Sequence, residues 1–124
     1  MKRGGAMFDV ASLQYNENGL IPAIAQDAET GMVLMMAWMN AEAVSRTLET
    51  GQVTYWSRSR QAFWIKGESS GHTQALREFR VDCDRDCLLL QVGQTGPACH
   101  TNRISCFYTI IDNGAERIGM DPVG

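Results

Sequence analysis

The chain has 124 residues, of which 44% are hydrophobic, and a formal net charge of -3. A chain of this size and composition predicts a single globular domain over residues 1–124, in which residues 1–8 and 115–124 are expected to be flexible termini. The acidic charge balance excludes a general nucleic-acid binder, because such proteins need a basic field.

Turn signals recur at short intervals and separate strand-like apolar stretches, which predicts a mostly β fold. The expected strands cover residues 20–26, 32–39, 53–56, 63–66, 75–81, 88–94 and 104–111. The first two flank a short turn and are expected to form a hairpin. Pro22 then needs an edge position or the start of its strand, because proline cannot donate a ladder hydrogen bond.

One main helix is predicted between Asn40, which is a good N-cap, and Gly51, which can end the helix. Ala41, Val44 and Leu48 fall at helical spacing and are expected to pack against a sheet. The predicted fold class is therefore mostly β with one main helix, in a sandwich-like or barrel-like arrangement of several sheets.

The four cysteines all lie between positions 83 and 106. The longest apolar run, residues 32–39, is far below the roughly 20 residues that cross a bilayer, and the N-terminus does not resemble a secretory signal. We therefore expect a cytoplasmic protein with no membrane or nucleic-acid partner. In that reducing compartment, clustered cysteines favour metal binding or catalysis over disulfides.

The spacing of the cysteines limits how they can share an ion. In an extended chain, Cys83 and Cys87 lie roughly 13 Å apart, which two Zn–S bonds of about 2.3 Å cannot span. Unless the backbone turns sharply, only one of them joins Cys99 and Cys106. Three sulfurs and one open position are typical of a catalytic zinc site. Ordinary buried cysteines are the alternative.

Three aspartates alternate with other residues in the same stretch, at Asp82, Asp84 and Asp86. In an extended segment their side chains emerge on one face, and the cysteines point to the other. A Mg²⁺ or Ca²⁺ ion would turn the repulsion between these carboxylates into coordination. A solvated acidic turn is the alternative interpretation.

Residues 55–60 and 64–72 mix indoles, cations, hydroxyls and glycines. Such a mixture suits a flat, phosphorylated ligand, because arginine binds phosphate, glycine admits backbone amides and aromatic rings stack on bases. A charged hairpin with Trp56 and Trp64 in the core is the alternative. His100 directly follows a candidate zinc ligand and is placed to exchange protons, although a lone histidine is more often structural.

Taken in order, these blocks resemble the phosphoribosyl-AMP cyclohydrolases of histidine biosynthesis. The resemblance covers most of the chain, in residues 20–23, 26–27, 37–40, 57–60, 64–72, 82–86, 96–100 and 105–107. Some relatives carry a pyrophosphohydrolase fused downstream. Residues 107–124 are too few for that enzyme, so the resemblance is to the stand-alone form.

The resemblance implies hydrolysis of the N1–C6 bond of the adenine ring of 1-(5-phosphoribosyl)-AMP by a zinc-activated water, giving the formimino imidazole carboxamide ribotide intermediate. The implied site comprises the zinc ligands Cys83, Cys99 and Cys106, the magnesium ligands Asp82, Asp84 and Asp86, and the proton-transfer group His100. The expected substrate contacts are Arg58, Ser59, Arg60, Trp64, Lys66, Glu68, Ser69, Ser70 and His72.

The implied assembly is an intertwined, mostly β homodimer whose zinc site is completed at the subunit interface by cysteines from both chains. Cys87 is not required by the family pattern and stays outside the predicted site.

Two other functions are less consistent with the sequence. A zinc base deaminase would carry His-x-Glu and Pro-Cys-x-x-Cys, and neither motif is present. A zinc-stabilised RNA-binding module could use Trp56, Arg58, Arg60 and Trp64 for stacking and phosphate contacts. It would need four zinc ligands, and the acidic net charge and the aspartate triplet weigh against it.

Overall fold

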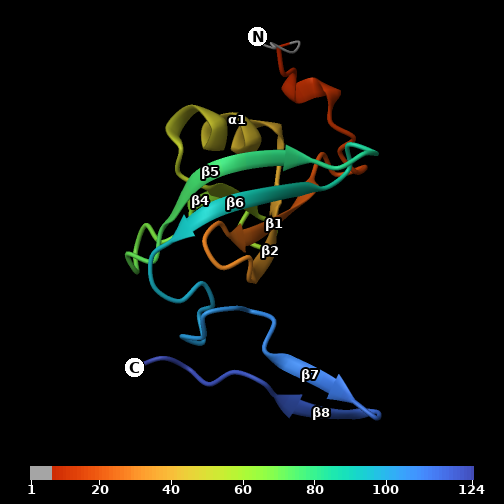
Figure 1. The fold of residues 1–124 in the computed structure, drawn as a ribbon. Coiled ribbons are helices and arrows are strands. Elements are labelled where there is room, and N and C mark those ends of the chain that lie inside the picture. The colour runs from red at the N-terminus through yellow and green to blue at the C-terminus, as the bar shows by residue number, and fades with distance from the viewer. Residues whose placement is uncertain (1–6) are drawn as a thin grey trace.

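The centre of the protein is a four-stranded sheet in the order β2-β1-β6-β5, seen in a computed structural model that describes residues 7–124 (Figure 1). Strand β1 is antiparallel to β2 and parallel to β6, and β5 is antiparallel to β6. The four strands are β1 (Ile21–Asp27), β2 (Val33–Met39), β5 (Gln74–Val81) and β6 (Leu88–Gln94).

Two small antiparallel hairpins and two helical segments complete the described fold. The hairpins pair β3 (Thr54–Ser57) with β4 (Ala62–Ile65), and β7 (Thr109–Asp112) with β8 (Ala115–Ile118). The helical segments are the 3-10 helix η1 (Val10–Ser12) and the helix α1 (Ala41–Thr50). The prediction of a mostly β fold with one main helix is confirmed, but none of the sheets within residues 7–124 closes into a barrel.

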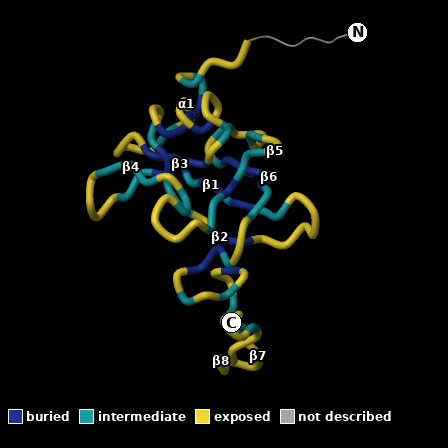
Figure 2. The backbone as a smooth tube through the Cα atoms, turned by 90° about the vertical axis from the view of Figure 1, so that its left-hand side faces the viewer, coloured by how far each residue is buried: buried dark blue, intermediate teal, exposed yellow. Residues whose placement is uncertain are grey.

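The core lies between one face of the large sheet and the layer made by α1 and β3. Strands β1 and β6 alternate buried and half-buried residues, because alternate side chains of a strand point to opposite faces. The buried set is Ile21, Ala23, Ala25, Leu88, Leu90 and Val92. Figure 2 shows the buried backbone concentrated in this body, whereas the β7–β8 hairpin extends from it and is largely exposed.

Helix α1 begins and ends where its sequence predicts. The Asn40 side chain accepts a hydrogen bond from the Ala43 N–H at 2.8 Å, and Gly51 adopts the left-handed conformation that ends the helix. The buried face differs from the expected one, since Leu48 is 40% exposed and Thr47 is fully buried. The Thr47 hydroxyl bonds both the N–H and the C=O of Thr54, so a polar contact joins the helix to β3.

The predicted β1–β2 hairpin is confirmed, and Pro22 lies near the start of β1, before the pairing with β6 begins at Ala23. The strand expected over residues 104–111 is wrong in its first half. There the Ser105 hydroxyl donates to the Val33 C=O at 2.7 Å and the Cys106 N–H to the Leu34 C=O at 2.7 Å. These contacts with the edge strand β2 take residues 104–108 out of a regular ladder.

The two ends that were expected to be flexible are residues 1–8 and 115–124. Residues 1–6 lie outside the described residues. Residues 115–124 include strand β8, and their flexibility stays a prediction, as does the single-domain organisation. No helix within residues 7–124 combines the length and apolar character needed to span a membrane.

Candidate metal and substrate site

The aspartate-rich segment forms a tight turn between β5 and β6. The Asp82 N–H donates to the Cys87 C=O at 3.1 Å, and the Asp82 carboxylate accepts from the N–H groups of Asp86 and Cys87. Arg85 adopts a positive φ of 63° within the turn. The segment is therefore a sharp turn. The estimate of roughly 13 Å between Cys83 and Cys87 and the sorting of side chains onto opposite faces both assumed an extended chain, so neither applies.

This turn gathers metal-binding groups at the surface. One donor atom from each of Asp82, Cys83 and Asp84 lies within 4.8 Å of the others, and all three side chains are exposed. Asp86 lies beside them, and its pKa is raised by desolvation, by a hydrogen bond to Asp82 and by nearby negative charge. The turn therefore combines oxygen donors, which suit hard cations, with one thiol, which suits softer ones.

A second group of metal-binding side chains, the thiols of Cys99 and Cys106, lies in the loop after β6. The Cys99 N–H donates to the Arg103 C=O at 3.1 Å, and the Asn102 N–H to the Cys99 C=O at 2.9 Å. This turn, with the Cys106 N–H fixed on β2, brings the Cys99 and Cys106 thiols close enough for each to shift the pKa of the other. The two cysteines thus meet within one chain.

The two thiols have different proton affinities. Burial raises the pKa of Cys99, but hydrogen bonds from the Thr101 hydroxyl, 3.0 Å from its Sγ, and from Cys106 outweigh this and leave the pKa lowered. Partial desolvation of its thiol and the neighbouring Cys99 raise the pKa of Cys106 to about 11. Cys99 is therefore the thiol of the pair that loses its proton more readily.

Lys66 is the cation beside this pair. Its Nζ donates to the Ala98 C=O at 2.7 Å, next to Cys99 in the chain. Burial lowers the pKa of Lys66, and the charges of Cys106 and Cys99 act in the opposite direction. Lys66 follows β4 directly, so this bond ties the β3–β4 hairpin to the cysteine loop.

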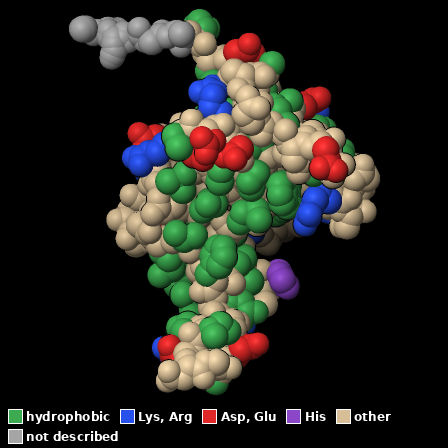
Figure 3. All heavy atoms as spheres, turned by 90° about the vertical axis from the view of Figure 1, so that its right-hand side faces the viewer, with side chains coloured by type: hydrophobic (Ala, Val, Ile, Leu, Met, Phe, Trp, Pro, Cys, Tyr) green, Lys and Arg blue, Asp and Glu red, His purple; other side chains and the backbone are tan. Residues whose placement is uncertain are grey.

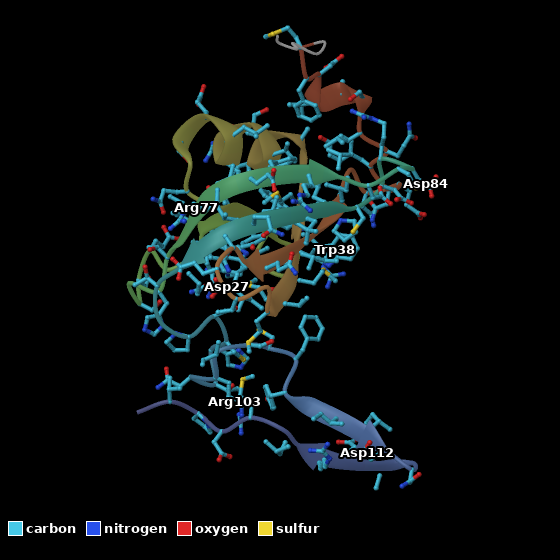
Figure 4. The ribbon with its side chains drawn as sticks, viewed as in Figure 1. Asp27, Trp38, Arg77, Asp84, Arg103 and Asp112 are labelled. Atoms are coloured by element: carbon cyan, nitrogen blue, oxygen red, sulfur yellow. The ribbon has the colours of Figure 1, made fainter. Side chains whose placement is uncertain are left out.

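Cys83 lies far from Cys99 and Cys106 of the same chain. The turn that carries Cys83 precedes β6 and the cysteine loop follows it; the seven residues of β6 span roughly 20 Å. In Figure 4, Asp84 of the turn lies at one end of the sheet, and Arg103 of the cysteine loop lies well away from it, below the sheet. One chain therefore places two of the three predicted zinc ligands together and the third at the other end.

The expected substrate contacts, except His72, line two adjoining hollows. A hollow of about 600 Å³, here called the Trp38 hollow, is lined by Trp38, Trp56, Ser57, Arg58, Ser59 and Trp64, among others. A second, of about 230 Å³, here called the Ser69 hollow, is lined mainly by Arg60, Trp64, Lys66, Glu68, Ser69 and Ser70. Trp64 lines both. The two sequence blocks thus meet, with aromatic walls and cations in one region.

The two histidines lie in different settings. His72 is half-buried, and its ring packs so closely against Gly96 that a Cβ at Gly96 would lie 2.6 Å from the His72 Cδ2. His72 thereby fixes the start of the cysteine loop and lines neither hollow. His100 is exposed and stands directly beside Cys99 in the turn.

Comparison with known proteins decides the family. The family model for phosphoribosyl-AMP cyclohydrolase matches residues 35–108, which include both hollows, the aspartate turn and the cysteine loop. The chain belongs to the phosphoribosyl-AMP cyclohydrolase family. It is 78% identical to the protein of that name from Dinoroseobacter shibae, over 94% of this chain and 98% of the relative. Relatives of the same name from Paracoccus denitrificans and Cereibacter sphaeroides are 74% and 73% identical, also over 94% of this chain.

The structure adds two residues to the candidate site of this phosphoribosyl-AMP cyclohydrolase family member that sequence reasoning missed. Trp38 of β2 lines the larger hollow and carries the Arg58 guanidinium over its ring, 5.0 Å from the centroid. Thr101 donates to the Cys99 sulfur. Trp38 lies in a block that matches the family, but its strand position alone is equally consistent with core packing. Thr101 lies two residues after Cys99, and a hydroxyl at that spacing could have been predicted to bond the sulfur.

Proposed function

We propose that this chain hydrolyses the N1–C6 bond of the adenine ring of 1-(5-phosphoribosyl)-AMP and so opens the ring to the formimino imidazole carboxamide ribotide intermediate of histidine biosynthesis. The observation that carries the proposal is the sulfur pair of Cys99 and Cys106 beside Lys66 and the two hollows, in a chain 78% identical to a relative named for this substrate. The proposed substrate is a free nucleotide and no nucleic acid.

The donor set at the cysteine loop fits zinc. Two neighbouring thiols that shift each other's pKa, one of them with a lowered pKa and a hydroxyl donor at 3.0 Å, match the thiolate ligands that zinc takes. We assign Cys99 and Cys106 of one chain and Cys83 of another as its ligands. When bound, zinc supplies a water whose pKa is lowered from 15.7 to about 7, and hence a nucleophile near neutral pH.

A homodimer would supply the third sulfur. Cys83 lies roughly 20 Å from the cysteine loop of its own chain, and a two-fold axis that brings a second chain's Cys83 to that loop creates two equal sites. An exposed apolar surface supports this assembly. It includes Val33 and Met36 on the edge strand β2, Phe107 at 60% exposure, and Ile111 and Ile118 of the β7–β8 hairpin.

Figure 3 shows hydrophobic side chains in a band that continues from the body onto the narrower part of the protein below it. The hairpin extends away from its own body, so it is available to a second copy. An arm of this kind fits an intertwined homodimer, because each copy would cover the apolar surface of the other.

In the proposed reaction the protein orients the substrate and transfers protons. Water adds its oxygen to C6, the C6–N1 bond breaks, and N1 takes up a hydrogen, so the addition balances. We assign the proton transfer to His100, which is exposed beside Cys99 and accessible to a bound substrate. The indole of Trp64, between the two hollows, is placed to stack on the flat purine.

Lys66 has a more specific role in this proposal than the substrate contact expected from the sequence. Its hydrogen bond to Ala98 and its position near both sulfurs hold the cysteine loop and offset thiolate charge. We predict that Lys66→Met weakens zinc binding about tenfold to a hundredfold, as loss of a supporting group around metal ligands usually does. Competition with a chromophoric chelator measures this. Arg60→Met, in the same Ser69 hollow, is the matched control and should keep its zinc affinity.

We assign Mg²⁺ to the aspartate turn, through Asp82, Asp84 and Asp86. Carboxylate oxygens of Asp82 and Asp84 lie within 4.8 Å of each other, and Asp86 interacts with Asp82, which supports a hard cation there. Asp84→Asn should raise the magnesium concentration needed for half-maximal activity about tenfold, since it removes one anionic ligand. The exposed Asp121, outside the turn, provides the control Asp121→Asn. Identical magnesium titrations of Asp84→Asn and the wild type would make the turn a purely structural element.

The proposed function is tested by a spectrophotometric assay with phosphoribosyl-AMP, run before and after removal of zinc by a chelator. We expect turnover, its loss on chelation and its return when zinc is added. Release of ammonia would instead indicate a deaminase, because ring opening at N1–C6 leaves all nitrogens in the product. Absence of turnover by the zinc-loaded protein would contradict the proposal.

A further inference from the structure

Arg58 differs from the three ion-paired arginines of the described chain in having an aromatic ring, and no carboxylate, as its partner. Arg46, Arg80 and Arg117 each pair with a carboxylate within 2.8 Å. Arg58 has no carboxylate at ion-pair distance within residues 7–124. Its guanidinium instead lies over the Trp38 ring and lines the Trp38 hollow. In a protein of net charge -3, an unpaired cation at the wall of a hollow is available for an anion from outside.

The stacking leaves the binding groups of Arg58 free. A guanidinium over an indole keeps its N–H donors in its own plane, so the fork can still bind two oxygens of one anion. Ser57 and Ser59 flank Arg58 on the β3–β4 turn and line the same hollow, with their hydroxyl oxygens 3.4 Å apart. A fork and two hydroxyls at the edge of an aromatic hollow match a phosphate monoester on a sugar.

We propose that the Trp38 hollow is a phosphate subsite, in which Arg58, positioned by Trp38, binds one of the two phosphorylated ribose arms of the substrate, while the Ser69 hollow takes the other arm. This inference rests on the proposed function, because phosphoribosyl-AMP carries one phosphate on each of two arms that leave the purine in different directions. Each hollow has its own arginine and its own pair of serines, namely Arg58 with Ser57 and Ser59, and Arg60 with Ser69 and Ser70.

Trp64 lies between the two proposed subsites and the sulfur pair where the reaction is expected. It lines both hollows, and its ring lies 4.9 Å from that of Tyr55, which is fully buried and hydrogen-bonded to Gln74 at 2.8 Å. Lys66 lies 5.9 Å from the Trp64 ring centroid and binds Ala98 beside Cys99. A purine on Trp64 would therefore lie between its two arms and near the sulfur pair.

The subsite predicts a binding defect without a metal defect. Arg58→Gln should raise the KM for phosphoribosyl-AMP about tenfold to a hundredfold, as expected for a lost charge-assisted phosphate contact, with kcat and zinc content within about twofold of the wild type. Arg46→Gln is the matched control. Arg46 also lies over an aromatic ring, 4.0 Å from the Phe63 centroid, but is already paired with Glu42, so its loss should leave KM unchanged.

Trp38 is tested as the positioning residue for Arg58. Trp38→Leu should raise KM in the same direction, and the double variant with Arg58→Gln should be no worse than Arg58→Gln alone, because both changes remove one interaction. Additive effects would mean that Trp38 acts independently of Arg58 and would overturn its positioning role.

AMP, which carries a single phosphorylated arm, separates the two hollows. As a competitive inhibitor it should bind about tenfold or more weakly to one member of the pair Arg58→Gln and Arg60→Gln and normally to the other. Equal weakening in both variants, or an unchanged KM in Arg58→Gln, would overturn the division into two subsites. If the wild type is fully active, either of these results contradicts only the two subsites and not the ring-opening reaction. An inactive wild type would contradict the proposed function itself.

Discussion

Cys106→Ser is expected to abolish turnover, by at least about a thousandfold, and to remove zinc from the purified protein. A serine hydroxyl stays protonated near neutral pH and is a poor zinc ligand, so the remaining sulfurs cannot hold the ion. Cys106 is exposed, so this change leaves the core intact, and loss of activity will not reflect unfolding. Metal analysis and the ring-opening assay on one preparation measure both effects.

Cys87→Ser is the matched control for this experiment. Cys87 lies outside the donor group formed by Asp82, Cys83 and Asp84, and its thiol donates to the Leu88 C=O at 3.9 Å, so it is not a predicted zinc ligand. Both zinc content and turnover should stay near those of the wild type. A Cys106→Ser protein with full zinc and full turnover would show that the catalytic ion is held elsewhere or is not needed.

His100→Ala is expected to retain zinc yet lose turnover by about a hundredfold to ten-thousandfold, the usual contribution of a proton-transfer group. His100 is exposed, so its removal takes away no core packing. The kcat of the zinc-loaded variant measures the effect, with circular dichroism as the check on folding.

Chemical rescue provides the control for this second prediction. Because position 100 is open to solvent, added imidazole should restore part of the turnover of His100→Ala, which a merely structural role would not allow. Full turnover of the variant with bound zinc would remove His100 from the mechanism.

Local sequence signals predicted much of the fold. Asn40 and Gly51 mark the ends of α1 through their own backbone chemistry, and Pro22 lies where a residue without an N–H is tolerated. Residues 104–108 were mispredicted because their hydrogen bonds go to β2, about 70 residues earlier in the chain. A pattern read along the chain contains no information about such a partner.

The sequence likewise predicted one part of the candidate site and not the other. The residue types and their order predicted candidate sulfur, carboxylate and phosphate-binding groups, and the turn between Cys99 and Cys106 was short enough to bring its ends together. The extended geometry assumed for residues 82–86 failed because the Asp82 carboxylate bonds the backbone of its own turn. The contact between Trp38 and Arg58 joins two distant segments and required the structure.

Complementation between two inactive variants tests most directly the claim that zinc is shared across a dimer. In a dimer of one Cys83→Ser chain and one Cys106→Ser chain, one site keeps all three sulfurs and the other loses two. Random re-assembly of equal amounts should thus restore about one quarter of wild-type activity and zinc, since half the dimers are mixed and each has one intact site. A mixture as inactive as its two components would contradict the shared site, because sites built within single chains cannot complement.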